Sequence, residues 1–237
     1  MTAGCKVKLC GTASRADARL AADAGADWFG VVVEADFSPR SLSIEQAKEL
    51  FADPPLPAVA LVFEMPEARL QVMIEALQPT AVQFLNLEQP EVLRRLKTQF
   101  PHVELWQSIH LPPAGENVDL QPVKDSVDTY LQAGIDLLLF DTAATINGKK
   151  KFGGTGITAD WCIIRQVLDS IRGKVPVLLA GGINPDNAAA GLEAVMPDGL
   201  DLCSGVEAAP GKRDPAKVRE LMQAVRQFAM NKGEAHQ

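Results

Sequence analysis

The chain alternates short apolar runs with longer amphipathic stretches. Several of the apolar runs show no alternation of apolar and polar side chains, which is typical of strands buried on both faces of a parallel sheet. Turn and helix-capping residues separate one run from the next. The pattern predicts eight strands, at residues 7–9, 28–33, 58–63, 81–84, 103–108, 137–140, 177–180 and 200–203.

Capping residues predict a helix after each run. Ser14 is placed to cap the first helix and Gly25 to close it, and Ser43 with Gln46 forms a capping box for the second. The remaining helix starts are marked by Pro66, Pro90, Asp160, Asn184-Pro185 and Asp214-Pro215, and a weaker helix is expected through Tyr130. The last helix is expected to end near Met230, leaving a frayed polar tail at residues 231–237.

Eight strand–helix units in this length predict an α/β protein, a single (β/α)₈ TIM barrel over residues 1–237. Two segments support a repeated unit: Ala24-Gly25-Ala26-Asp27 and Ala133-Gly134-Ile135-Asp136 each close a helix and start a strand. The alternative is an open doubly wound sheet. Such a sheet normally carries its phosphate-binding turn after the first strand, whereas the glycine turns here follow the last two.

Composition limits the partners. The formal net charge of -7 argues against nucleic acid or an anionic membrane, and no apolar run is long enough to span a bilayer. The N-terminus lacks the apolar core of a signal peptide, so a cytoplasmic protein is expected. The 4 cysteines form no CxxC motif and the 3 histidines do not cluster with them, so we expect no metal, no cofactor and no disulfide. Monomer and homodimer both remain open.

Two glycine turns near the C-terminus suggest a phosphate site. They are Ala180-Gly181-Gly182-Ile183 and Asp201-Leu202-Cys203-Ser204-Gly205, and each interrupts an apolar run before a predicted helix. Backbone N–H groups at a helix N-terminus favour an anion. The same order of elements also describes a plain strand-to-helix connection. Phosphate binding is favoured because the two turns follow neighbouring strands.

Active-site groups of such barrels project from the C-terminal ends of the strands, which selects Cys10 and Asp141. A modest electropositive or helix-terminus influence would make some thiolate of Cys10 available as a base or nucleophile, although a small buried hydrophobe is the equal alternative. Asp141 follows four apolar residues, and desolvation would raise its pKa towards use as a general acid; the alternative is a carboxylate that bonds its own turn. Cys203 is expected in the core, and Cys5 and Cys162 are expected to be structural.

Two loops add further candidates. Arg40, in Ser38-Pro39-Arg40, can bind a carboxylate or phosphate in bidentate fashion, or it can be a surface arginine without a role. Residues 141–157 are expected to form the longest loop. Its turn of Gly153, Gly154, Thr155 and Gly156 lacks the context of a nucleotide-binding loop and is interpreted as a mobile lid.

Six motifs together resemble the phosphoribosylanthranilate isomerase family of tryptophan biosynthesis. They are Lys8-Leu9-Cys10-Gly11, Ser38-Pro39-Arg40, Leu139-Phe140-Asp141-Thr142, Phe152-Gly153-Gly154-Thr155-Gly156, Ala180-Gly181-Gly182-Ile183-Asn184-Pro185 and Ser204-Gly205-Val206-Glu207. They occur in the family's order from the first strand to the last helix. The resemblance implies a (β/α)₈ barrel that catalyses an Amadori rearrangement of a phosphorylated small molecule.

The resemblance also implies roles for particular residues. Asp141 matches the family's general acid, which protonates the furanose ring oxygen, and Cys10 matches the base that removes the C2 proton. Arg40 matches the residue near the anthranilate carboxylate. The residues expected to bind substrate are Arg40, Gln83, Gly181, Gly182, Asp201, Ser204 and Gly205.

The middle of the chain departs from the family. After the fourth strand the family usually has Gln-Leu-His-Gly, where this chain has Gln83-Phe84-Leu85-Asn86. Glu64, which follows the third strand, and Trp106, on the fifth, belong to the same altered set. Three functions therefore stay open: the isomerase itself, a drifted paralogue that acts on a related phosphosugar, and a non-catalytic barrel that keeps a phosphate site.

Overall fold

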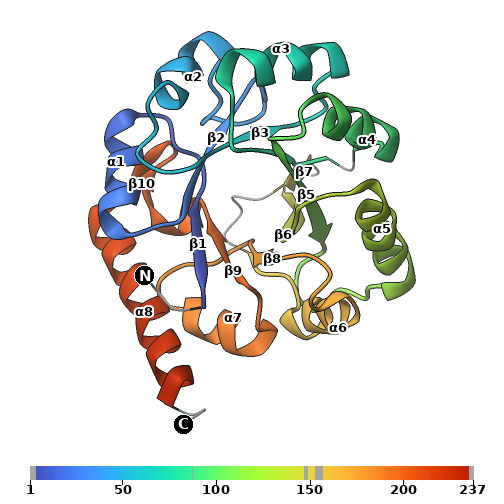
Figure 1. The fold of residues 1–237 in the computed structure, drawn as a ribbon. Helices are drawn as coiled ribbons and strands as arrows, with labels where there is room; N and C mark the ends of the chain where they lie inside the picture. The colour runs from blue at the N-terminus through green and yellow to red at the C-terminus, as the bar shows by residue number, and fades with distance from the viewer. Residues whose placement is uncertain (1–3, 87, 147–148, 153–156, 235–237) are drawn as a thin grey trace.

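Eight parallel strands form a closed ring, as seen in the computed structural model, which describes residues 4–86, 88–146, 149–152 and 157–234 (Figure 1). Around the ring each strand pairs with its neighbours, and the pairings β5–β6 and β1–β9 close it. The strands are β1 (Lys6–Leu9), β2 (Trp28–Val32), β3 (Ala58–Val62), β4 (Ala81–Phe84), β5 (Glu104–Leu111), β6 (Leu137–Ile146), β8 (Val177–Leu179) and β9 (Gly199–Leu202). The predicted (β/α)₈ barrel is confirmed.

Helices surround the ring on its outer side (Figure 1). They are α1 (Arg15–Ala24), α2 (Ile44–Phe51), α3 (Glu67–Leu77), α4 (Pro90–Gln99), α5 (Leu120–Ala133), α6 (Trp161–Ile171), α7 (Ala188–Val195) and α8 (Pro215–Glu234). The predicted caps are confirmed at three helices. The Ser14 side chain accepts from the N–H of Asp17, Ser43 and Gln46 form the capping box, and Asp160 caps α6.

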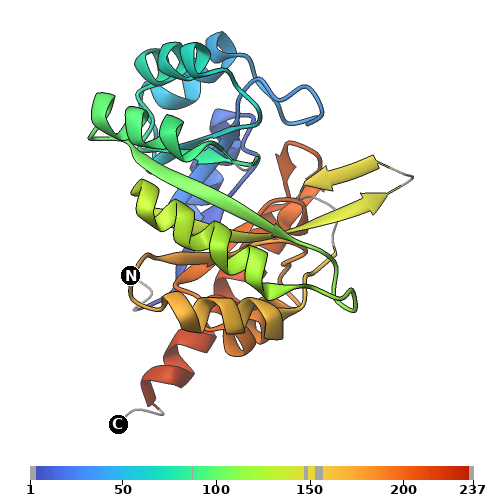
Figure 2. The ribbon, with the colours of Figure 1, turned by 90° about the vertical axis from the view of Figure 1, so that its right-hand side faces the viewer.

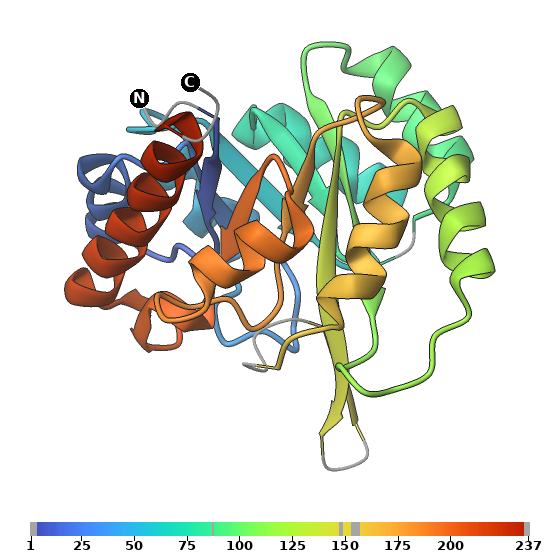
Figure 3. The same cartoon turned by 90° about the horizontal axis from the view of Figure 1, so that it is seen from below.

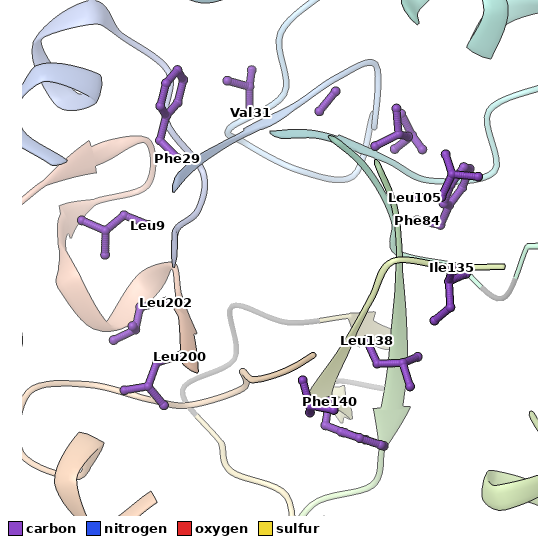
Figure 4. Packing of buried hydrophobic residues seen from close by; sticks show 14 of the residues in the cluster. Leu9, Phe29, Val31, Phe84, Leu105, Ile135, Leu138, Phe140, Leu200 and Leu202 are labelled. Carbon is purple, nitrogen blue, oxygen red and sulfur yellow. The ribbon is translucent and has the colours of Figure 1, made fainter. Parts of the chain in front are cut away.

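The two faces of each strand enter different apolar clusters. Leu9, Phe29 and Phe140 point away from the barrel axis towards the helices (Figure 4) and belong to the larger cluster. Alternate residues such as Val59 and Leu139 form a smaller cluster inside the ring. Both faces are buried, which is why the strands read as continuous apolar runs.

Two strands extend further than the sequence predicted. β5 continues to Leu111 and β6 continues past Asp141 because residues 106–111 pair with residues 137–142. Residues 143–146 of β6 pair instead with residues 149–152. Beyond this ladder β6 turns back into β7 (Lys149–Phe152), and the two form an antiparallel hairpin that projects from the barrel (Figures 2 and 3). The prediction of a long loop at residues 141–157 is therefore wrong for residues 141–146 and 149–152, which belong to β6 and β7. The proposed lid residues Gly153, Gly154, Thr155 and Gly156 lie outside the described residues.

The segments after β8 and β9 also differ from prediction. Helix α7 begins at Ala188 rather than at Asn184, because the Asn184 side chain accepts from the N–H groups of Asp186 and Asn187 in a preceding turn. After β9 comes a single 3₁₀ turn, η1 (Ser204–Val206). The short hairpin of β10 (Glu207–Ala209) and β11 (Lys212–Arg213) separates it from α8. The second glycine turn therefore does not open an α-helix.

The last helix continues beyond its predicted end. α8 runs to Glu234, so residues 231–234 are helical, and the prediction of a frayed tail from residue 231 is wrong. Lys232 lies in the last turn, where a cation interacts favourably with the helix dipole. Its Nζ lies 5.2 Å from the centre of the Phe228 ring, which adds a further local contact. Within the described ranges, no helix has the length and apolar content needed to cross a membrane.

Candidate active site

Parallel strands place the candidate residues at one end of the barrel, which we call the mouth: the end at which the strands have their carboxyl termini. Cys10 follows β1, Asp141 lies on β6, Gly181 and Gly182 follow β8, and Ser204 with Gly205 follows β9. The N–H of Cys10 donates to the Leu202 carbonyl at 2.7 Å, which continues the β1–β9 pairing into the mouth. The closed ring thus brings together residues that are distant in sequence.

Asp141 is a buried acid whose pKa lies near neutral pH, so that it is still partly protonated there. Burial raises the pKa of its carboxyl to about 7, against the opposing effect of a hydrogen bond that the N–H of Thr142 donates to Oδ1 at 2.6 Å. The charge of Asp201 raises this pKa further, and Lys8 lowers it. Gly181 packs directly against this group, since a Cβ on Gly181 would lie 2.9 Å from Asp141 Oδ1. Asp141 therefore has the protonation state of a general acid.

The pKa of Cys10 is shifted in the opposite direction to that of Asp141: it is lowered. A hydrogen bond from the Cys203 thiol lowers the pKa of Cys10 and outweighs its burial, and the charges of Lys8 and Arg213 act in the same direction. Arg213 also holds the backbone here, since its Nη2 donates to the carbonyl oxygens of Leu9 at 2.8 Å and Cys10 at 3.0 Å. Cys10 therefore has the properties of a base at the same mouth.

A buried ion pair lies inside the ring, between Lys8 on β1 and Asp201 on β9. Lys8 Nζ and Asp201 Oδ1 are 2.9 Å apart, and the Lys8 side chain has no exposed surface. Burial opposes the charge on Lys8, but Asp201 and Cys10 together outweigh burial and raise the pKa of this lysine above its ordinary value. The sequence analysis assigned Asp201 to substrate binding and overlooked Lys8. The signal was a lysine between the apolar residues Val7 and Leu9 in a predicted strand.

Removal of one member of this pair is expected to destabilise the barrel. Lys8→Met leaves the Asp201 carboxylate buried without a cation, which costs about 3–5 kcal/mol. Chemical denaturation at pH 7 measures the loss in the free energy of unfolding. The control is Lys8→Met combined with Asp201→Asn, which removes both charges and should recover most of the loss. Equal stability of the single and double variants would contradict this account.

Arg40 is held at the mouth by an acidic partner. Its Nε donates to Glu207 Oε1 at 2.8 Å and its Nη2 to Oε2 at 2.5 Å, and this bidentate pair raises the pKa of the guanidinium. The N–H of Gly211 also donates to Glu207, which fixes the carboxylate. Gly11 has φ of +73°, and a Cβ there would lie 2.6 Å from Arg40 Cδ. The arginine is thus positioned by a glutamate that the sequence analysis did not single out.

The two glycine turns touch each other. A Cβ on Gly205 would lie 2.0 Å from the Ile183 carbonyl oxygen, so only glycine allows this approach. Gly182 has φ of +66°, and a Cβ there would lie 2.6 Å from the backbone of Ile157. Asn187 Nδ2 donates to the Gly182 carbonyl at 3.0 Å and holds the first turn in place. The prediction that the two turns lie next to each other is confirmed. Gly181 itself packs against Asp141.

Three of the altered residues, Glu64, Leu85 and Asn86, follow the carboxyl ends of β3 and β4 at the mouth, whereas Trp106 lies apart from them. Leu85 belongs to the apolar cluster inside the ring, and the Asn86 side chain accepts from the N–H of Glu64 at 3.1 Å. Trp106 is fully buried and packs edge-on against Trp28, with ring centres 5.3 Å apart. Trp28 begins β2, so this contact lies towards the opposite end of the barrel from the mouth.

Gln83 lies inside the barrel and is buried. Its Nε2 donates to Ser108 Oγ at 3.1 Å, which connects β4 to β5. The structure therefore gives Gln83 an internal partner on the neighbouring strand.

His110 is a site residue that the sequence analysis missed. It lies opposite Asp141 in the β5–β6 register, and its Nε2 is 3.8 Å from Asp141 Oδ2. The predicted fifth strand ended at Ser108, which left His110 outside the barrel. The continued alternation of Ile109 and Leu111, both buried, was the signal that the strand extends.

The cysteines also differ from expectation. Cys203 is partly exposed beside Cys10 rather than in the core, and Cys162 is exposed on α6 rather than structural. Cys5 is buried, as expected. Among the described residues, no group of three or more His, Cys, Asp or Glu side chains is arranged to hold a metal ion.

The Asp141 carboxyl, the Cys10 thiol and two glycine turns lie at the same mouth of a closed parallel barrel. Active sites of (β/α)₈-barrel enzymes are found at this end of the barrel. The family model for N-(5'-phosphoribosyl)anthranilate isomerase matches residues 7–224. The chain belongs to this family, and the resemblance predicted from its motifs is confirmed.

Individual relatives agree with this assignment. The N-(5'-phosphoribosyl)anthranilate isomerase of Methanocella arvoryzae is 37% identical over 224 residues, which cover 93% of this chain and 98% of the relative. The solved structure of the isomerase from Pyrococcus furiosus shares the fold, with a TM-score of 0.76, 24% identity and coverage of 94% of this chain and 99% of that chain. A second solved structure of such an isomerase, in complex with reduced 1-(o-carboxyphenylamino)-1-deoxyribulose 5-phosphate, also shares the fold, with a TM-score of 0.71, 22% identity and the same coverage.

Proposed function

We propose that this protein catalyses the Amadori rearrangement of N-(5-phosphoribosyl)anthranilate to 1-(2-carboxyphenylamino)-1-deoxyribulose 5-phosphate in tryptophan biosynthesis. One observation carries the proposal: the same mouth holds Asp141, with its pKa raised to about 7, and Cys10, with its pKa lowered. Two groups whose pKa values are shifted in opposite directions suit paired proton transfer near neutral pH. A barrel that only binds a phosphorylated ligand has no need of such a pair.

The two groups act in sequence in this proposal. Protonated Asp141 donates to the furanose ring oxygen, and the C1–O bond breaks to give an open-chain Schiff base. The Cys10 thiolate then removes the proton from C2, which gives an enolamine that tautomerises to the ketone. The Lys8–Asp201 pair influences both steps, because these charges act on the pKa of Cys10 and of Asp141.

Substrate binding is assigned to the surrounding residues. Gly182, Ser204 and Gly205 present backbone N–H groups to the phosphate, and the close contact of their two turns supports a single site for one anion. Arg40 is assigned to the anthranilate carboxylate through Nη1, since Nε and Nη2 are paired with Glu207. Gly181 is assigned to the phosphate turn by position, and Gln83 and Asp201 to the inner surface of the pocket. The monomeric or homodimeric state and the cytoplasmic location stay predictions.

The phosphate assignment predicts a specific effect of Gly205→Ala. The added Cβ would lie 2.0 Å from the Ile183 carbonyl oxygen, so the turn must shift and its N–H groups with it. We expect KM for the phosphorylated substrate to rise at least about tenfold, a loss of about 1.4 kcal/mol. Steady-state kinetics measures the change. Gly173→Ala is the control, because it adds the same methyl group at a position where no atom lies within 4 Å of the added Cβ. An unchanged KM in Gly205→Ala would argue against the site.

A direct assay tests the proposed function. Purified protein is mixed with freshly generated phosphoribosylanthranilate, and the loss of its fluorescence is followed, with Asp141→Asn as the negative control. Turnover that requires Asp141 supports the proposal. Absence of turnover together with retained binding of inorganic phosphate would favour the non-catalytic barrel instead.

A further inference from the structure

Cys10 and Cys203 occupy neighbouring positions on adjacent strands. The β1–β9 register pairs Leu9 with Leu202, so each cysteine is the next residue after a paired position. The N–H of Cys10 donates to the Leu202 carbonyl at 2.7 Å, which keeps the two segments in contact at this point. Paired strands lie about 4.8 Å apart. Disulfides need Cα atoms about 4.4–6.8 Å apart, so the backbone spacing already suits a bond.

The side chains of the two cysteines meet as well. Both side chains lie on the inner side of the ring, since Cys10 belongs to the smaller apolar cluster and Cys203 packs against that cluster. Cys203 Sγ lies 2.8 Å from the place that a Cβ on Gly11 would take, which puts this sulfur against the residue that follows Cys10. The absence of a side chain on Gly11 is what leaves room for it. Neither cysteine is in a disulfide in this structure.

The surroundings make Cys10 the thiol that reacts first with an oxidant. Cys10 lies near the cationic groups of Lys8 and Arg213, which stabilise a thiolate, and a thiolate is the form that reacts with an oxidant. Cys203 is partly exposed, whereas Cys10 is almost fully buried, so the second thiol is within reach of solvent at the mouth. A low-pKa thiol beside a second thiol is the arrangement of redox-sensitive cysteines.

We propose that Cys10 and Cys203 form a reversible oxidation site that a hydroperoxide converts to a disulfide. With hydrogen peroxide, the Cys10 thiolate attacks one peroxide oxygen, the O–O bond breaks, and Cys10 sulfenic acid and hydroxide form; an organic hydroperoxide would release the corresponding alkoxide instead. The Cys203 thiol then attacks the sulfenic sulfur, the S–S bond forms, and the sulfenic oxygen leaves as water with the thiol proton. The peroxide is reduced and two thiols are oxidised. We expect this oxidation to inhibit turnover because it consumes the Cys10 thiolate, the proposed base. This consequence rests on the proposed function.

The experiment uses the full chain with Cys162→Ser as background, which removes the exposed thiol on α6. The protein is treated with hydrogen peroxide, the remaining thiols are alkylated, and peptides are mapped by mass spectrometry. We expect a linked peptide pair containing Cys10 and Cys203, lost on treatment with dithiothreitol. Turnover of phosphoribosylanthranilate is measured in parallel and is expected to fall and recover with the disulfide.

Cys203→Ser in the same background provides the matched comparison. Without a second thiol, the Cys10 sulfenic acid is expected to oxidise further to the sulfinic acid, which dithiothreitol does not reduce. Oxidised protein without the linked peptides, or full recovery of unmodified Cys10 in Cys203→Ser, would overturn the proposal. The mapping does not depend on activity. A disulfide in a protein without turnover would therefore contradict only the proposed function, and turnover without a disulfide only this inference.

Discussion

Asp141→Asn is expected to lower kcat by about 10²–10⁴-fold, the usual contribution of a general acid. Asparagine has nearly the same shape, and its Oδ1 can keep the hydrogen bond from the N–H of Thr142, but it has no proton of suitable acidity to donate. The contacts proposed for the substrate's phosphate and carboxylate come from other strands, so KM should change little. Steady-state kinetics of the purified variant measures both parameters.

The same substitution is expected to stabilise the fold at high pH. The pKa of Asp141 is about 7 when folded and about 4 in an unfolded chain, so the folded state binds this proton more tightly. The stabilisation from Asp141 is therefore complete below about pH 4 and is lost as pH rises through about 7. Above pH 7 the native protein keeps a buried carboxylate, at a cost of at most about 4 kcal/mol, and asparagine avoids this cost.

Denaturation of both proteins at pH 5 and pH 8 tests this account. The stability gained by Asp141→Asn should be larger at pH 8 than at pH 5. A variant that is inactive and equally destabilised at both pH values would show that the lost activity reflects damage to the fold. The pH dependence of kcat/KM should also fall on its alkaline side near pH 7, where Asp141 loses its proton.

Cys10→Ser is expected to lower kcat/KM by about 10²–10⁴-fold. A serine hydroxyl is far less acidic than a thiol, so Lys8 and Arg213 cannot produce a useful amount of the alkoxide. The change in volume is small, and the hydrogen bonds of Arg213 to the backbone of Leu9 and Cys10 do not involve the sulfur. The thermal midpoint should therefore stay within a few degrees of that of the native protein. Kinetics and thermal denaturation measure the two effects.

Cys162→Ser is the matched control for this prediction. It makes the same chemical change at an exposed cysteine of α6, and its activity should equal that of the native protein. Turnover by Cys10→Ser within about tenfold of the native rate would show that another group removes the C2 proton. Turnover requires protonated Asp141 and ionised Cys10 together. It is therefore expected to fall at high pH, where Asp141 loses its proton, and at low pH, where Cys10 gains one.

Local sequence features determined the barrel. Apolar runs mark strands that are buried on both faces, and Ser14, Ser43 and Asp160 mark helix starts through hydrogen bonds to backbone groups two or three residues away. Both signals depend on neighbours in the chain, so they can be read without a structure. The positions of Cys10, Asp141 and the two glycine turns at strand ends follow from the same pattern.

The tertiary structure alone decided how distant residues combine at the mouth. Lys8 pairs with Asp201, Arg40 with Glu207, and Cys10 with Cys203 only after β9 closes the ring against β1. These contacts join residues that are more than 160 positions apart, so no local pattern records them. The extension of β5 and β6, which brings His110 to Asp141, likewise depends on pairing between two strands rather than on either strand alone. Composition and periodicity describe which residues are buried, whereas the partner of each buried charge depends on ring closure.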